Sequence, residues 1–201
     1  MPPLLVGMTG ASGVIYGVRL LEVLKESKIE SHLVMTNAAK ETLVLETTRK
    51  VSELESLASV SYAINDIAAP PASGSFRSRG MVVVPCSMKT LAGIANGYSA
   101  NLLLRAAEVT LKERRPLIIV PRETPLTRIQ LENMIRVMDA GAVILPAMPG
   151  FYTRPKTMEN LVDFLVGKIL DVLEIEHTLY SRWGGPDVSP GSAHPAYASS
   201  D

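Results

Sequence analysis

The chain is built from short apolar runs, each ending at a glycine-rich or polar turn that is followed by a helical pattern. The first run, residues 4–8, stops at residues 9–13 (Thr-Gly-Ala-Ser-Gly), and apolar residues then recur at helical spacing. The second run, residues 32–35, leads into a helical stretch over residues 38–46. A strand, a helix and a second strand form a right-handed unit, so the sheet is predicted to be parallel.

Later segments continue this alternation. Residues 81–84 and 117–120 contain no polar side chain, which is typical of strands in the middle of a parallel sheet covered on both faces. Further strands are predicted at residues 61–64, at an edge, and at residues 142–145. The fold class is therefore α/β, with a mostly parallel sheet between helical layers.

Helix signals lie between these strands. A short helix is predicted near residues 54–58, and Asn101 is the expected N-cap of a helix reaching about residue 114. Thr127 and Gln130 form a capping-box pattern before a helix with one apolar face. That face consists of Leu131, Met134, Ile135 and Met138, and the last helix, residues 158–173, is the most regular amphipathic pattern in the chain.

The length of 201 residues suits one domain, which we place at residues 1–183. Beyond Trp183 the chain is rich in Gly, Pro, Ser and Ala. Residues 184–201 are predicted to be a flexible tail, or one ordered only by a neighbouring subunit.

The charge balance excludes several classes of partner. Twenty Lys and Arg residues match twenty Asp and Glu residues, so no net field attracts nucleic acid or an anionic membrane. No apolar run approaches the roughly 18 residues of a membrane-spanning helix. The single cysteine, Cys86, and the lack of a signal-like N-terminus predict a cytoplasmic protein. Three scattered histidines (His32, His177 and His194) offer neither a metal site nor a Ser-His-Asp hydrolase.

Ligands of such sheets collect at the carboxyl ends of the strands, so the first turn is a candidate binding site. Glycines at positions 7, 10 and 13 differ in spacing from the dinucleotide fingerprint, but they allow backbone amides to approach an anion. The second strand is followed by Thr36 and Asn37, with no acidic residue for a ribose. A mononucleotide is therefore favoured, and a tight turn without a ligand stays open as the alternative.

The ends of two later strands are also polar. Ser87, Lys89 and Thr90 are positioned to face a phosphate or a flavin edge, unless Ser87 only caps a helix and Lys89 lies in solvent. Cys86 has no base beside it and is predicted to be a small buried residue. Arg122 and Glu123 suit a phosphate ligand and a proton donor, with a surface ion pair as the alternative.

Two other cationic positions have structural explanations of their own. Arg105, Glu108 and Lys112 share one helix face, which an exposed row of salt bridges explains equally well. Lys168 borders the apolar stripe of the last helix, as a lysine does when its stem packs and its ammonium group reaches solvent.

Taken together, seven ordered motifs resemble those of the flavin prenyltransferases, formerly called phenolic acid or polyprenyl-hydroxybenzoate decarboxylase subunits. The resemblance covers residues 4–183. The motifs are residues 9–13 (TGASG), 70–75 (PPASGS), 85–87 (PCS), 111–116 (LKERRP), 120–123 (VPRE), 131–134 (LENM) and 149–152 (PGFY).

The resemblance implies a flavodoxin-like (Rossmann-like) three-layer sandwich and a dodecamer with sites at subunit contacts. It implies an enzyme that joins the dimethylallyl group of dimethylallyl monophosphate to N5 and C6 of reduced FMN without a metal ion. The product, prenylated FMN, would serve a partner decarboxylase.

The resemblance also implies roles for individual residues. FMN would be held by Gly10, Ala11, Ser12, Thr36, Ser87, Met88, Lys89, Thr90 and Arg122. The prenyl phosphate would be surrounded by Ser73, Gly74, Lys112, Arg122, Tyr152 and Lys168, with Trp183 near the prenyl group. Glu123 would transfer protons for the leaving phosphate, and Ser12, near N5, and Glu46 complete the catalytic set.

Two departures from the family pattern stand out. Ser87-Met88-Lys89-Thr90 replaces the frequent Ser-Thr-Gly-Thr and resembles the branch associated with phenolic acid decarboxylation. Lys168 replaces a frequent arginine, which removes a bidentate grip on phosphate.

Two other functions stay open at this point. One is an FMN-dependent decarboxylase that acts directly on its substrate, although the histidine that such enzymes carry after the first turn is missing here. The other is a non-catalytic FMN carrier, although such carriers are typically acidic and this chain is neutral.

Overall fold

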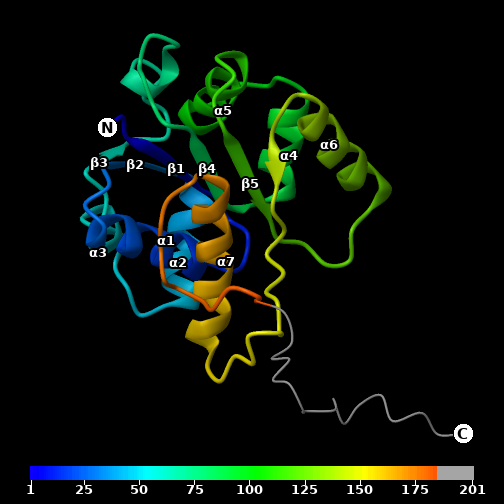
Figure 1. Ribbon diagram of the computed structural model, residues 1–201. Coiled ribbons are helices and arrows are strands. Elements are labelled where there is room, and N and C mark those ends of the chain that lie inside the picture. Colours follow the sequence, from blue (N-terminus) through cyan, green and yellow to red (C-terminus); the bar gives the residue numbers. More distant parts are fainter. Residues whose placement is uncertain (185–201) are drawn as a thin grey trace, which may run out of the picture.

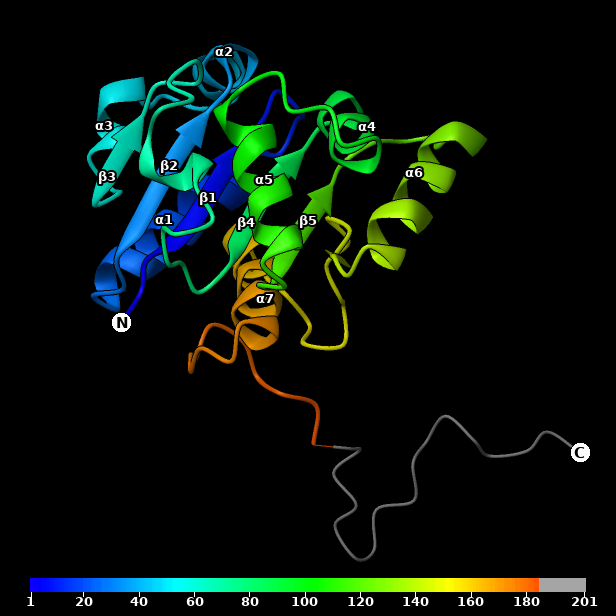
Figure 2. The same cartoon turned by 90° about the horizontal axis from the view of Figure 1, so that it is seen from above.

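A six-stranded parallel sheet forms the centre of the protein in the computed structural model, which describes residues 1–184 (Figures 1 and 2). Its strand order is β3-β2-β1-β4-β5-β6. The strands are β1 (Leu4–Met8), β2 (Ser31–Met35), β3 (Val60–Tyr62), β4 (Met81–Cys86), β5 (Leu117–Pro121) and β6 (Val143–Ile144). All five neighbouring pairs are parallel, so the predicted α/β class and sheet type are confirmed.

Helices cover both faces of this sheet. They are α1 (Val14–Glu26), α2 (Asn37–Glu46), α3 (Val51–Glu55), α4 (Met88–Ala95), α5 (Leu102–Lys112), α6 (Arg128–Asp139) and α7 (Met158–Val172), with a 3-10 turn, η1 (Pro70–Ala72). One core cluster joins the sheet to α1, α2, α3 and α7. The other joins it to α4, α5 and α6 on the opposite face, which gives three layers (Figure 1).

Alternation along each strand explains why the central runs lack polar residues. Val82 and Val84 point into the core under α1 and α7, whereas Val83 points into the core under α5. Side chains of neighbouring residues face opposite sides of a sheet, so every position of a doubly covered strand is buried.

The strand order locates the binding edge. Without the short edge strand β3, the order matches that of flavodoxin-like sheets, and β3 adds a sixth strand beyond β2. The order reverses between β1 and β4, because the chain moves outward to β2 and β3 and then returns to the other side of β1. Ligands of such sheets bind outside the carboxyl ends of the strands at this point.

Some boundaries differ from the prediction. The short helix lies at Val51–Glu55 instead of residues 54–58, and β6 contains only two residues. The helix Met88–Ala95 begins at the N-cap Ser87, which the sequence offered only as an alternative.

The apolar face predicted for α6 lies mostly at the protein surface. Met134 is buried, but Leu131, Ile135 and Met138 are 46%, 57% and 55% exposed. The helix packs inward through Met134 and Val137 instead, and this leaves an apolar surface outside.

The prediction of a single domain ending at residue 183 stays a prediction, because residues 185–201 of the proposed tail lie outside the described residues. Across residues 1–184, no helix has both the length and the apolar character needed to cross a bilayer.

Candidate functional site

The turn after β1 directs two backbone amides toward a carboxylate of the protein itself. Gly13, the N-cap of α1, has φ 95°, a left-handed conformation that glycine adopts easily. The N–H groups of Gly13 and Val14 donate to Glu46 Oε2 at 2.9 and 3.1 Å. The sequence predicted an anion at this helix N-terminus. In the structure that anion is Glu46, because α2, which ends at Glu46, packs beside α1.

Arg122 joins the same turn from the far side of β4. Its Nε donates to the carbonyl of Ser12 at 3.2 Å, which links two residues 110 positions apart. Partial burial raises the pKa of Glu46, but hydrogen bonds from Ser12, Gly13 and Val14 and the charge of Arg122 outweigh it, so the pKa is lowered overall. Ser12, Glu46 and Arg122 therefore form one cluster at the carboxyl edge of the sheet.

Glu123 lies beside this cluster and is exposed. Its carboxylate accepts a hydrogen bond from the N–H of Thr124 at 3.1 Å. Within residues 1–184 it makes no salt bridge with Arg122, so the alternative of a surface ion pair is wrong. The other lone pairs of this carboxylate are open to a ligand that carries a hydrogen-bond donor.

Thr9 holds the two strands at the reversal point together. It is 1% exposed, its hydroxyl donates to the carbonyl of Pro85 at 2.8 Å, and it accepts from the N–H of Ser87 at 2.7 Å. The start of α4 is thereby fixed beside the turn that follows β1. No role was predicted for Thr9, although a threonine directly after an apolar strand is a recognisable signal for such a link.

The hydroxyl groups predicted to face a ligand cap helices. Ser87 Oγ accepts from the N–H of Thr90 at 3.3 Å, and Thr36 Oγ1 accepts from the N–H of Ala39 at 3.1 Å. Lys89 is exposed, so the alternative for Ser87 and Lys89 describes the geometry correctly. A cap satisfies only one amide, and the first amides of α4 have no acceptor within the helix. Capping and anion binding are therefore compatible here.

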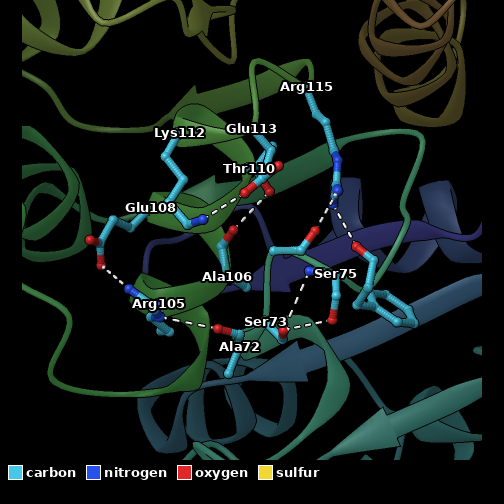
Figure 3. Close-up of polar contacts among 12 residues, drawn as sticks. Ala72, Ser73, Ser75, Arg105, Ala106, Glu108, Thr110, Lys112, Glu113 and Arg115 are labelled. Atoms are coloured by element: carbon cyan, nitrogen blue, oxygen red, sulfur yellow. Dashed lines mark hydrogen bonds and ion pairs between the residues drawn. The ribbon is translucent and has the colours of Figure 1, made fainter.

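A second group of predicted residues lies at the end of α5 (Figure 3). Lys112 pairs with Glu113 at 2.6 Å, and a Cβ added to Gly74 would lie 2.8 Å from Lys112 Nζ. Arg115 holds the adjoining turn by donating to the carbonyls of Phe76 and Gly74 at 2.6 and 2.8 Å. The structure therefore brings Ser73, Gly74 and Lys112 together. No separate role was predicted for Arg115, because its partners lie about 40 residues away in the sequence.

This α5 group includes the predicted row of salt bridges. Arg105 pairs with Glu108 at 3.1 Å and also donates to the carbonyl of Ala72 at 3.1 Å. The predicted row of salt bridges is therefore correct for Arg105 and Glu108 but not for Lys112, which pairs with Glu113 instead. Arg105 also holds η1 in place.

Lys112 and Arg122 lie at opposite ends of β5. Lys112 ends α5 before the strand begins, and Arg122 follows the last residue of the strand. Five strand residues at about 3.3 Å each separate the two positions by about 16 Å. Within one chain, the two cations do not meet.

A third group lies on α7 and on the segments before and after it. The rings of Tyr152 and Trp183 have centroids 5.7 Å apart with an interplanar angle of 78°, and Tyr152 packs equally close to Phe164. Lys168 lies 3.5 Å from Asp171, so its ammonium group has a carboxylate partner. Asp171 was absent from the predicted site, although a carboxylate three residues after a cation on a helix is a visible signal.

The remaining predictions concern Cys86 and metals. Cys86 is fully buried, and burial raises the pKa of its thiol far above the ordinary value, so the prediction of an inert small residue is confirmed. Among residues 1–184, no group of three His, Cys, Asp or Glu side chains is arranged to hold a metal ion.

Comparison with known proteins agrees with this geometry. The Flavoprotein family model matches residues 1–181. A protein of Alkalihalophilus pseudofirmus named flavin prenyltransferase UbiX is 54% identical over 189 residues, covering 89% of this chain and 94% of its own. The chain belongs to the flavin prenyltransferase family.

Solved structures of this family have the same fold. A crystal structure named AnUbiX (PadA1), in complex with FMN and dimethylallyl pyrophosphate, has a TM-score of 0.90 and 47% identity over 92% of this chain and 98% of that one. A dodecameric FMN-dependent UbiX-like decarboxylase from Escherichia coli O157:H7 has a TM-score of 0.89 and 48% identity over 91% and 100% of the two chains. The flavodoxin-like fold and the resemblance to the family are both confirmed.

Proposed function

We propose that this flavin prenyltransferase joins the dimethylallyl group of dimethylallyl monophosphate to N5 and C6 of reduced FMN. No metal ion takes part, and the prenylated FMN serves a partner decarboxylase. The observation that carries the proposal is the cluster of Ser12, Glu46 and Arg122, because it puts a cation and a carboxylate at the turn where flavins bind in this fold.

The residues at the carboxyl edge fit an FMN molecule. Gly10 allows the turn to pack closely against α2, because an added Cβ would lie 2.4 Å from the Cβ of Ala38. Ala11 is buried and Ser12 is exposed, so Ser12 is the side chain of this turn that a flavin can reach. The amides that begin α4, at Met88 and Lys89, and the hydroxyl groups of Thr36, Ser87 and Thr90 suit a phosphate and a ribityl chain. Arg122 supplies a charged donor.

Reduced FMN, when bound, supplies the nucleophilic N5 and C6 atoms. The chain's own residues handle the charge of the departing phosphate. Lys112, Arg122 and Lys168 stabilise the negative charge that grows on the phosphate when the allylic C–O bond breaks. Ser73 and Gly74 line the phosphate, and Glu123 protonates it as it leaves.

Aromatic side chains handle the opposite charge. The face of Trp183 stabilises positive charge on the dimethylallyl group, and Tyr152, which packs against Trp183, contributes to the phosphate site. Ser12 donates a hydrogen bond to the ionised carboxylate of Glu46 at the flavin turn. The protein thereby separates cation stabilisation from anion stabilisation, which is the requirement of an allyl transfer without a metal.

The assembly follows from where these groups lie. Lys112 lies on α5, in the helical layer on one face of the sheet, and Lys168 lies on α7 in the layer on the other face. Tyr152 packs against Phe164 of α7 and so lies on the side of Lys168. Because each helix is about 10 Å across, one small phosphate cannot touch both layers of a single chain. We propose that the prenyl site is completed by neighbouring chains in a dodecamer, and the exposed Leu131, Ile135 and Met138 support such contacts.

We also propose a cytoplasmic location. The lone Cys86 and the need for reduced FMN both suit a reducing compartment.

The main alternative is direct decarboxylation with FMN, which the name of the Escherichia coli relative suggests for that protein. Anaerobic incubation with reduced FMN and dimethylallyl monophosphate separates the two. We expect mass spectrometry to find a flavin carrying one added C5 unit. Bound FMN without an adduct would contradict prenyl transfer. A non-catalytic FMN carrier would likewise bind FMN, and it would convert no substrate at all.

The role of Glu123 has its own test. We expect Glu123→Gln to retain FMN, because no flavin-binding group is removed, and to lose about 100-fold in turnover when the proton donor is missing. Adduct formation is measured by mass spectrometry and FMN affinity by flavin fluorescence. An unchanged turnover rate would remove Glu123 from this role.

A further inference from the structure

The segment after α7 folds back along that helix. Residues 174–184, here called the C-terminal strap, run beside α7 in Figure 1. Ile175 and Leu173 are both 8% exposed, and the N–H of Ile175 donates to the carbonyl of Leu170 at 2.9 Å. The strap ends at Trp183 and Gly184, so it carries the only tryptophan of the protein.

One carboxylate of α7 binds the strap at three positions. Asp171 accepts hydrogen bonds from His177 Nε2 at 3.1 Å, from Arg182 Nη2 at 2.6 Å and from the hydroxyl of Tyr180. His177 Nδ1 accepts from the N–H of Leu179 at 3.2 Å, so Nε2 carries the proton that points to Asp171. The carboxylate is 16% exposed and the His177 side chain 3% exposed.

The same carboxylate reaches Lys168 on its own helix. Lys168 Nζ lies 3.5 Å from Asp171 Oδ2, one turn away. Asp171 therefore serves two cations, and the closer bond goes to Arg182 of the strap. Lys168 is held loosely near the helix surface and is 45% exposed, which leaves its ammonium group available to a phosphate.

An aromatic row connects the tethered strap to Tyr152. Tyr180 packs on Phe164 with centroids 4.9 Å apart, and Phe164 packs on Tyr152 at 5.7 Å. Gly167 allows this approach, since a Cβ there would lie 2.6 Å from the Tyr180 ring. Trp183 closes the row against Tyr152.

The Asp171 carboxylate that binds the C-terminal strap is ionised near neutral pH. Burial raises the pKa of Asp171, but hydrogen bonds from Tyr180, Arg182 and His177 outweigh it and lower the pKa well below the ordinary value. Burial and the bond to Asp171 raise the pKa of Tyr180 to about 12, so Tyr180 stays a donor. Asp171 is therefore a fixed anion and not an acid or base.

We propose that Asp171 is a positioning residue for the prenyl phosphate, because its contacts tie the C-terminal strap to α7 and hold Lys168, Tyr152 and Trp183 in one arrangement. Asp171 itself touches no substrate and acts through these three side chains. The inference rests on the proposed function, which gives the three residues their role.

The test uses the full chain loaded with FMN and the variant Asp171→Asn. We expect dimethylallyl monophosphate, titrated by calorimetry, to bind about 10-fold more weakly, since three contact residues lose their fixed positions. The FMN dissociation constant should stay unchanged. The single Trp183 reports the strap directly, and its fluorescence anisotropy should fall while acrylamide quenching rises.

Asp163→Asn is the matched control. Asp163 lies on the same helix and loses the same charge, but its partner is Arg19 of α1 at 2.7 Å. We expect wild-type binding of dimethylallyl monophosphate and wild-type Trp183 anisotropy. Tyr180→Phe, which removes one donor and keeps the ring and the charge, should shift both readouts in the direction of Asp171→Asn and provides a second test if that variant fails to fold.

The measurements distinguish the positioning role of Asp171 from the proposed prenyl transfer. Weaker binding with lower anisotropy supports the positioning role. Unchanged binding overturns it, whether or not Trp183 moves, and so does a wild-type protein that fails to bind dimethylallyl monophosphate. A wild type that binds this compound but forms no C5 adduct refutes prenyl transfer alone, and the comparison of binding constants still tests Asp171.

Discussion

The flavin turn and the phosphate-binding groups are built in opposite ways. At the flavin turn, Ser12, Glu46 and Arg122 come from three distant segments of one chain and already touch. The proposed phosphate ligands lie in separate groups, one containing Lys112 and the other Lys168. Each of these two lysines already has a carboxylate partner within its own chain.

The difference reflects the different requirements of binding a flavin and binding a phosphate. A flavin is a large ligand, and the end of one sheet offers enough surface to bind it. A phosphate needs several cations within hydrogen-bond reach, and gathering them in one chain would leave like charges facing each other when the site is empty. Pairing each lysine with a carboxylate of its own chain, Glu113 or Asp171, offsets that repulsion in the assembled site.

Mixing inactive variants gives the largest expected effect. Lys112→Ala and Lys168→Ala should each lose about 100-fold in adduct formation, because each removes a cation that stabilises the leaving phosphate. If the two lysines of a site come from different chains, random co-assembly of both variants restores roughly a quarter of the sites. Adduct formation after unfolding and refolding the mixture measures this recovery.

A second mixture provides the control. Arg122→Ala and Glu123→Gln affect neighbouring residues of one chain, so every site in that mixture keeps one defect and no recovery is expected. Recovery in the second mixture, or none in the first, would show that the contrast between the two regions is wrong.

Acid should weaken the α7 group more than it weakens the flavin turn. The folded-state pKa of Asp171 is lowered from 3.8, so its stabilisation is present above that value and is lost as pH falls through the lowered value. Near pH 7, Asp171→Asn should cost about 2 kcal/mol of unfolding free energy, because a mostly buried anion with several donors is lost.

Urea unfolding at equal protein concentration measures this difference. We expect it to shrink when the measurement is repeated at about pH 3, and more so at about pH 2. Asp163→Asn again serves as the reference variant. A difference that stays constant with pH would mean that packing, and not the charge of Asp171, holds the strap.

Sequence patterns found the sheet and most of the flavin turn, because both depend on local signals. Residues 81–84 are apolar since both faces of β4 are covered, and that burial is visible as a run without polar residues. The pattern also showed an apolar face on α6, but it could not show what that face contacts. Ile135 and Met138 have the spacing of a buried face but lie outside, and a pattern cannot tell a face that packs inward from one that a neighbouring chain covers.

Local sequence patterns could not predict the contacts between residues of the site. Arg122 reaches Ser12 only because β5 and β1 both end beside β4, and no spacing rule connects positions 110 residues apart. The resemblance to the family named both residues without showing that they touch. It also omitted Asp171, whose role depends on how the strap folds back.

The smallest expected effect concerns Glu46 at the flavin turn. Glu46→Gln keeps an oxygen that can accept from Gly13 and Val14 but removes the charge at the start of α1 and beside Arg122. Glu46 is exposed, so solvent screens its interactions, and Glu46→Gln should lower the free energy of unfolding by only about 0.5 kcal/mol. Its pKa is lowered from 4.5, so this stabilisation too is present above that value and fades as pH falls below it.

Salt distinguishes this small effect from that of Asp171. Urea unfolding of Glu46→Gln and wild type in about 1 M salt should give nearly equal stabilities, because exposed charges are screened there within a few ångströms. The difference caused by Asp171→Asn should persist, since a mostly buried carboxylate is screened much less. Equal salt sensitivity of the two variants would mean that the α7 group is as open to solvent as the flavin turn, and the contrast between a preformed turn and a locked strap would then fail.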